Sequence, residues 1–206
     1  MTADARPSVF INCPFSDDYT PFFRAIVFAV ADCGFQPRCA LEDIDSGEIR
    51  LDKIMRIIQD CRYGIHDLSN MALDPNSHLP RFNMPLELGL FLGAKRYGDA
   101  LQKQKRLIVM DREAFRYREA ISDISGQDVE CHQGDPLKAI KRVRDWLRTV
   151  SRRKTLPGGT TITERYEQYE CDFPEICSVL SLDGNDLPFQ DLLETIAAWQ
   201  SLNEQV

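Results

Sequence analysis

The stretch GEIRLDKIMRIIQDCRYGIHDLS (residues 47–69) contains the alternation that decides the fold. Its first half repeats apolar residues at the spacing of one helix face, namely Leu51, Ile54, Ile57 and Ile58. Its second half, YGIHDL at 63–68, is a short apolar run of strand length. A helix that leads directly into a buried strand is typical of a parallel sheet, because parallel strands need a crossover connection between them.

The same alternation continues on both sides of this stretch. The predicted strands cover residues 8–13, 35–40, 63–68, 106–110 and 128–132. Predicted helices lie between them, including 21–33, whose apolar residues favour one face, and 136–151. The sequence therefore predicts an α/β fold, a doubly wound parallel five-stranded sheet with helices on both faces.

A boundary is expected after the last of these helices. The basic run Arg152-Arg153-Lys154 and the turn Pro157-Gly158-Gly159 separate residues 1–155, the α/β domain, from residues 156–206. Two amphipathic helices, 163–182 and 187–202, are expected in this C-terminal extension. The extension is too short for a core of its own, so it is predicted to pack on the sheet domain or to mediate self-association.

Composition narrows the function classes. The net charge of −7 and the pI near 5.0 argue against a general nucleic-acid coat or a binder of anionic membranes. The N-terminal residues lack the pattern of a secretory signal and no run has the length of a membrane helix, so a cytoplasmic protein without membrane association is expected. Seven cysteines form no CxxC pair, which favours reduced thiols and predicts neither a disulfide framework nor a metal site.

One carboxylate stands out in RFNMPLELGLFLGAK (residues 81–95), where Glu87 lies in a stretch that is otherwise apolar or small from Met84 to Ala94. Burying a lone carboxylate is unfavourable unless it is paired, hydrogen-bonded or protonated. Asn83 is predicted to be the N-cap of a helix that is apolar on nearly all sides, as a helix packed between other elements would be. A loop of about 14 residues precedes this helix, and loops of that length in compact domains are usually functional.

Other polar and aromatic side chains follow the predicted strands, where open parallel sheets bind ligands. Strand 8–13 leads into a loop that contains Asn12, Cys13, Pro14, Phe15 and Tyr19. Arg38 ends the second strand, and Asp67 ends the third. Phe15 or Tyr19 can stack on a base, and Arg38, Arg50 or Lys53 can hold a phosphate.

Three segments, VFINCPFSDDYTPFF, GEIRLDKIMRIIQDCRYGIHDLS and above all NMPLELGLFLGAK, resemble the TIR-like and nucleoside 2-deoxyribosyltransferase-like superfamily. The resemblance covers residues 8–155 and is most specific at Asn83 with Glu87-Leu88-Gly89. It implies a flavodoxin-like sheet and cleavage of the N-glycosidic bond of a nucleoside, nucleotide or NAD. It also implies catalytic roles for Glu87 and Asp67, with substrate contacts near Asn12, Phe15 and Tyr19. The first loop reads NCPF, which departs from the glycine- or serine-rich loop common in that superfamily.

The chemistry of glycosidic cleavage agrees with a single carboxylate. Breaking a C–N glycosidic bond gives the ribose oxocarbenium character, which a carboxylate stabilises or traps as a covalent intermediate. Nicotinamide is already cationic in NAD and leaves easily, so NAD is the expected substrate, and no cofactor is required. The N-terminal turn of the helix is expected to help keep Glu87 ionised. The resemblance further implies a homo-oligomeric effector of bacterial antiphage defence that depletes a nucleotide.

Three other functions remain open from the sequence. The same pocket can bind a nucleotide signal without cleaving it, with Glu87 reading a ribose hydroxyl, or it can exchange bases on deoxynucleosides. A third alternative is a hydrolase in which Cys13 and His66 pair with Asp67.

A basic cluster in the last helix of the sheet domain raises a separate question about partners. Within residues 141–154, Lys141, Arg144, Arg148 and Arg152 share one predicted helix face. This face can contact an activating protein, a nucleic acid or a second copy of the chain, although a solvated basic face is the more frequent case.

Overall fold

The computed structural model describes residues 6–71 and 81–203. A five-stranded sheet of order β2-β1-β3-β4-β5 runs through its centre, and every neighbouring pair of strands is parallel. The strands are β1 (Ser8–Asn12), β2 (Gln36–Arg38), β3 (Tyr63–Asp67), β4 (Arg106–Asp111) and β5 (Val129–Cys131). The prediction of an α/β, flavodoxin-like parallel sheet is confirmed, and the predicted strands differ from the observed ones by one or two residues at their ends.

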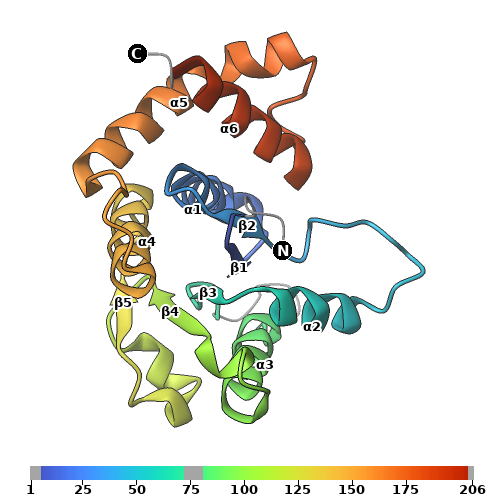
Figure 1. The fold of residues 1–206 in the computed structure, drawn as a ribbon, viewed down its shortest axis with the longest axis vertical. Coiled ribbons are helices and arrows are strands. Elements are labelled where there is room, and N and C mark those ends of the chain that lie inside the picture. The colour runs from blue at the N-terminus through green and yellow to red at the C-terminus, as the bar shows by residue number, and fades with distance from the viewer. Residues whose placement is uncertain (1–5, 72–80, 204–206) are drawn as a thin grey trace.

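Helices cover both faces of the sheet. On one face lie α1 (Thr20–Asp32) and α4 (Pro136–Ser151), and on the other α2 (Arg50–Asp60) and α3 (Asn83–Tyr97) (Figure 1). Alternation along each strand divides the core accordingly, since Val9 and Ile11 join the α1 side while Phe10 joins the α2 side. The order of strands reverses between β1 and β3, so the crevice at their carboxyl ends is the expected place for a ligand.

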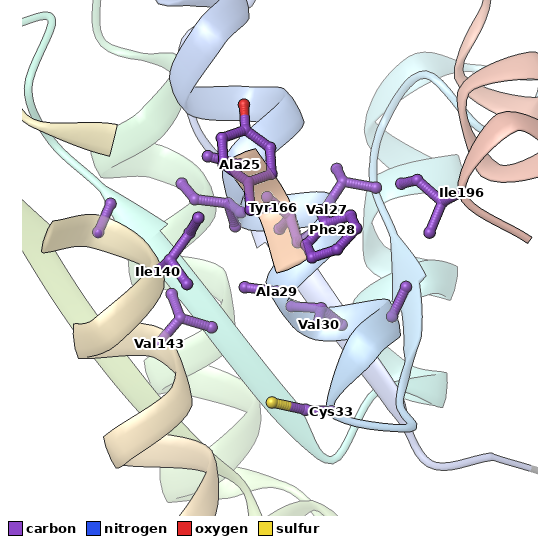
Figure 2. Close-up of a cluster of buried hydrophobic side chains, with 14 of the residues drawn as sticks. Ala25, Val27, Phe28, Ala29, Val30, Cys33, Ile140, Val143, Tyr166 and Ile196 are labelled. Atoms are coloured by element: carbon purple, nitrogen blue, oxygen red, sulfur yellow. The ribbon is translucent and has the colours of Figure 1, made fainter. Parts of the chain in front are cut away.

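The C-terminal extension forms α5 (Gly159–Leu180) and α6 (Phe189–Asn203), which lie over the outer side of α1 (Figure 1). Figure 2 shows Tyr166 of α5 and Ile196 of α6 beside Phe28 of α1, in a cluster that also includes Ile140 and Val143 of α4. These side chains form one continuous hydrophobic core with the sheet. The packing alternative expected for the extension is therefore observed, and the division into two domains and a role in self-association stay predictions.

Helices α1 and α3 differ from the prediction in how much of their surface is buried: α1 is buried on more sides than expected, and α3 on fewer. Helix α1 was predicted to bury one face, but every residue from Ala25 to Val30 is fully buried, because α5 and α6 cover the side that faces away from the sheet. Helix α3 was predicted to be packed between other elements, yet Leu86 is 54% exposed, and the buried residues of α3 lie on the side towards the sheet.

The basic cluster of α4 is largely used within the chain. Arg144 donates to the carbonyl of Pro157 at 2.5 Å and Arg148 to the carbonyl of Arg153 at 2.8 Å, so both fix the connection between α4 and α5. Arg153 donates to the carbonyl of Gly34 and lies over the ring of Phe35. These contacts explain the cluster as a structural feature, and a partner at residues 141–154 stays a prediction.

Candidate functional site

Glu87 lies over the carboxyl ends of the central strands because α3 approaches β3 closely. Gly64 of β3 makes this approach possible, since a Cβ there would lie 2.8 Å from the ring of Phe91 in α3. Glu87 precedes Phe91 by four residues and is therefore on the same side of the helix. Its position follows from a local rule, helical spacing, and from one contact between distant segments.

The carboxylate of Glu87 is buried without a compensating partner among residues 6–71 and 81–203, where it forms neither a hydrogen bond nor an ion pair. The residue is only 6% exposed. Burial raises its pKa to about 7, and the positive charge of Arg50 opposes this shift. Desolvation outweighs the charge of Arg50 and leaves Glu87 only partly ionised at neutral pH, and the expected help from the helix terminus stays a prediction.

Asn12, at the end of β1, joins the three elements around Glu87. Its amide nitrogen donates to the carbonyl of Met84 at 2.8 Å and lies 3.0 Å from Nδ1 of His66. Both contacts use the amide nitrogen of Asn12. Its Oδ1 forms no hydrogen bond to a described residue, so this oxygen can accept a hydrogen bond from a ligand. Asn12 stays a predicted substrate contact and also holds the first turn of α3 against the sheet.

His66 is a packing residue in this arrangement. It is fully buried, with the rings of Phe10 and Phe91 edge-on to its imidazole at centroid distances of 5.9 and 5.0 Å. Burial lowers its pKa to about 3, so the imidazole is neutral at physiological pH. Its Nδ1 accepts from Asn12, which places the ring proton on Nε2.

The thiol–imidazole hydrolase alternative is wrong for this fold. Cys13 belongs to the core on the α1 side, whereas His66 packs against Phe91 on the α3 side. Burial raises the pKa of the Cys13 thiol well above its usual value, and the charges of Asp67, Cys39 and Glu87 raise it further. A protonated thiol on the opposite face of the sheet from the imidazole is not an activated nucleophile.

Asp67 lies on the α1 side, in a polar network that the sequence did not reveal. Its Oδ1 accepts from the backbone N–H of Ser69 at 2.8 Å, and its Oδ2 lies 3.1 Å from Nε2 of His132. The N–H of Gly134 donates to His132 Nδ1, so Nδ1 is an acceptor and a ring proton is on Nε2, which is 2.8 Å from Ser69 Oγ. The Nε2–H of His132 donates to that hydroxyl, and Asp67 Oδ2 makes a close contact with Nε2 that lacks hydrogen-bond geometry.

A second buried carboxylate, Asp111 at the end of β4, completes the network. Arg116 donates to Asp111 at 2.5 Å and also to the carbonyls of Leu68 and Ser69 at 3.0 and 2.7 Å. Sequence reasoning missed Asp111, Arg116 and His132. The rule that polar residues gather at the carboxyl ends of strands could have found Asp111 and His132 had it been applied to the last two strands.

The other predicted site residues divide into buried and accessible ones. Tyr19 is 3% exposed and its ring stacks on Phe22 at 5.2 Å, so the ring has no free face for a base, contrary to the stacking expected of it. Phe15 is 38% exposed and meets Phe23 edge-on at 5.4 Å. Pro14 and Phe15 line a cavity of about 290 Å³ between the first loop and the connection of α5 to α6.

Two basic residues proposed for phosphate are already paired. Arg38 forms a two-point ion pair with Glu42, in which Nη2 lies 2.6 Å from Oε1. Lys53 donates to the carbonyl of Asp43 at 2.6 Å. Arg50, the first residue of α2, is exposed, and its positive charge lowers the pKa of Glu87. Of the three basic residues it is therefore the best placed for an anionic ligand near Glu87.

Asn83 does not cap α3 as expected. The helix begins at Asn83 itself, and the N-cap position falls on Phe82, whose side chain makes no capping hydrogen bond. Asn83 is exposed, so its predicted role as a substrate contact remains sterically possible.

The part of the chain that the structure describes contains no cluster of three or more His, Cys, Asp or Glu side chains that could hold a metal ion. Likewise, none of its helices combines the length and apolarity needed to cross a membrane.

The fold and the strand-end geometry define a flavodoxin-like α/β protein with a buried glutamate, unpaired among the described residues, near the point where strand order reverses. Comparison with protein-family models finds no matching family, and comparison with curated proteins finds no match. The resemblance to the TIR-like and deoxyribosyltransferase-like superfamily therefore stays a prediction from the residues quoted above.

Proposed function

We propose that this protein hydrolyses the N-glycosidic bond of a nucleotide, most favourably the bond between ribose and nicotinamide in NAD. The observation that carries the proposal is Glu87, a carboxylate 6% exposed at the ligand crevice and unpartnered among the described residues. An unpaired buried carboxylate destabilises the fold, and a ribose that develops positive charge is a partner that would offset this cost.

The proposed reaction assigns one role to each group. The bond from ribose C1′ to the pyridinium nitrogen breaks, and its electron pair leaves with nicotinamide, which becomes neutral. The ionised carboxylate of Glu87 stabilises the resulting oxocarbenium ion or bonds to C1′ as a glycosyl ester. Water then adds to C1′ and loses a proton to solvent, which releases ADP-ribose and regenerates the carboxylate.

The surroundings of Glu87 support this chemistry. Since the carboxylate has few competing hydrogen bonds, its negative charge acts on the ribose in a poorly hydrated environment, where electrostatic stabilisation is strong. A pKa of about 7 leaves a substantial fraction ionised at neutral pH. Asn12 Oδ1 and Arg50 are available to a ribose hydroxyl and to a phosphate.

Asp67 is proposed as a second functional carboxylate, which supports the site by holding the end of β3 in place. Its contacts with Ser69 and His132 fix the end of β3, beside the segment that leads to α3. The superfamily resemblance extends the proposal to a homo-oligomeric cytoplasmic effector in bacterial antiphage defence.

The test is nicotinamide release from NAD by the purified chain, measured alongside a panel of nucleosides. Glu87→Gln should lower the rate by about 10³-fold or more, because a carboxamide neither bonds to C1′ nor stabilises its charge. Glu164→Gln, an exposed glutamate of α5 on the side of α1 away from the sheet, is the matched control and should keep full activity. Full activity in Glu87→Gln would refute the catalytic assignment whatever the substrate.

A nucleotide-binding module without catalysis is the second candidate. The pKa of about 7 favours it in one respect, because a protonated Glu87 can donate a hydrogen bond to a ribose oxygen and an ionised one can accept from a hydroxyl. This candidate predicts NAD binding without cleavage, with affinity that falls in Glu87→Gln. Free base released from deoxynucleosides would instead support the base-exchange alternative.

A further inference from the structure

The cavity between the first loop and the C-terminal extension has no role in the chemistry described above. Its volume is about 290 Å³, which lies near the lower limit of the roughly 300–1,000 Å³ typical of small-molecule sites. It has room for one base or nucleoside and not for a whole dinucleotide. Its walls come from the loop after β1, from Leu41, and from the α5–α6 connection at residues 184–187.

The lining favours a flat, uncharged ring. Phe15, Phe23 and Leu187 present aromatic and aliphatic surface, on which a heterocycle can stack. Asp17 and Asp186 contribute carboxylates that repel a phosphate and accept hydrogen bonds from an amine. The hydroxyl of Ser16, which also belongs to the lining, is buried without a hydrogen-bond partner among the described residues.

The cation of the cavity is already neutralised. Arg24 Nη1 lies 3.3 Å from both carboxylate oxygens of Glu170, and its guanidinium lies over the ring of Phe173 at 4.1 Å. With Arg24 paired, the lining carries no compensation for an anion, so the phosphates of a nucleotide would lie outside the cavity.

The cavity is close to Glu87 but does not include it. Asn12 precedes Pro14 of the lining by two residues, and its amide donates at 2.8 Å to the carbonyl of Met84, three residues before Glu87 in α3. The charge of Glu87 also contributes to the raised pKa values of Cys13 and Cys39, which precede Pro14 and Leu41 of the lining by one and two residues. The ring attached to the reacting carbon must touch Glu87, so a ring held in this cavity belongs to the other end of the substrate.

We propose that this cavity binds the adenine ring of the nucleotide and that the α5–α6 connection determines base specificity, an inference that rests on the proposed cleavage of NAD at Glu87. The C-terminal extension would then complete the substrate site in addition to covering α1. Adenine fits the lining because it is planar and neutral, and because its exocyclic amine donates to carboxylates such as Asp186 or Asp17.

The decisive variant is Leu187→Trp, which fills the cavity without changing Glu87. KM for NAD should rise about tenfold or more with kcat within about threefold, since only binding of the distant base is lost. Cleavage of nicotinamide mononucleotide, which has no adenine, should be unchanged. Val179→Trp places the same indole on an exposed residue of α5 outside the lining and should behave as wild type. Equal effects on both substrates, or none on either, would overturn the proposal.

A binding measurement separates this proposal from the catalytic one and does not depend on Leu187→Trp folding. Titration calorimetry of the Glu87→Gln variant with adenosine monophosphate should show binding, and inosine monophosphate, which lacks the amine, should bind several-fold more weakly. Asp186→Ala should reduce that preference. If adenosine monophosphate binds but wild type does not cleave NAD, the adenine site is supported and the proposed hydrolase activity is refuted. If wild type cleaves NAD but adenosine monophosphate does not bind, the hydrolase activity is supported and the adenine site is refuted.

Discussion

Two buried carboxylates at the same edge of the sheet have different surroundings. Asp67 is fully buried and contacts an N–H of Ser69 and the imidazole of His132. Glu87, only 6% exposed, has neither kind of contact among the described residues, and burial raises its pKa to about 7. The difference teaches that burial alone does not identify a reactive carboxylate; the absence of internal partners does so better, because it leaves the charge available to a ligand.

The largest expected effect on stability is at the partnered carboxylate. Asp67→Ala should lower the free energy of unfolding by about 3 kcal/mol, because the buried N–H of Ser69 loses its acceptor and His132 loses the carboxylate that lies 3.1 Å from its Nε2. Chemical denaturation measures this change. Asp18→Ala, at an exposed aspartate between β1 and α1, should change stability by less than about 0.5 kcal/mol. A stable Asp67→Ala protein without activity would show that Asp67 acts chemically and would remove the contrast with Glu87.

Glu87→Gln should have the opposite sign. The folded-state pKa of about 7 lies above the ordinary 4.5, so between these pH values the native state binds more protons than the unfolded state, and stability falls as pH rises. Removing the ionisable group should therefore stabilise the protein by up to about 3 kcal/mol above pH 7 and by little near pH 4.5. Unfolding curves of both proteins from pH 4.5 to 8 test this. A constant difference across the range would contradict the raised pKa.

Catalysis should follow the same titration. If the ionised carboxylate acts on the ribose, kcat/KM for NAD should rise about tenfold per pH unit below pH 7 and become constant above it. Initial rates at low NAD concentration give this profile. Activity that falls through pH 7 would instead indicate that the protonated form of Glu87 is required, which would favour a general-acid role.

The smallest effect is expected at Asn83. It begins α3 without capping it and is exposed, so Asn83→Ala should change the free energy of unfolding by less than about 0.5 kcal/mol. A rise in KM for NAD in a variant of unchanged stability would then report a ligand contact. A loss of about 1 kcal/mol or more would indicate that the asparagine does cap the helix in solution.

The basic residues of α4 and the first loop show which contacts could not be predicted from the sequence. The spacing of Arg144 and Arg148 indicated a shared face, but spacing carries no information about the carbonyls of Pro157 and Arg153 that they bind. Likewise, Tyr19 was predicted to offer its ring to a base because it follows β1 in a polar loop, whereas the ring is buried and stacks on Phe22. In each case the deciding partner is set by how the chain folds back and not by composition.

The sequence by itself determined the alternation of strands and helices, the parallel five-stranded sheet and the singular position of Glu87. These are local properties. The spacing of apolar residues distinguishes a helix from a strand, and strands that alternate with helices along the chain pair in a parallel sheet. Only the tertiary structure decided that α5 and α6 cover α1, that Asp67 rather than Glu87 is partnered, and that a cavity lies beside the first loop. Those outcomes depend on contacts between segments far apart in the chain, such as Ser69 with His132, which no local pattern records.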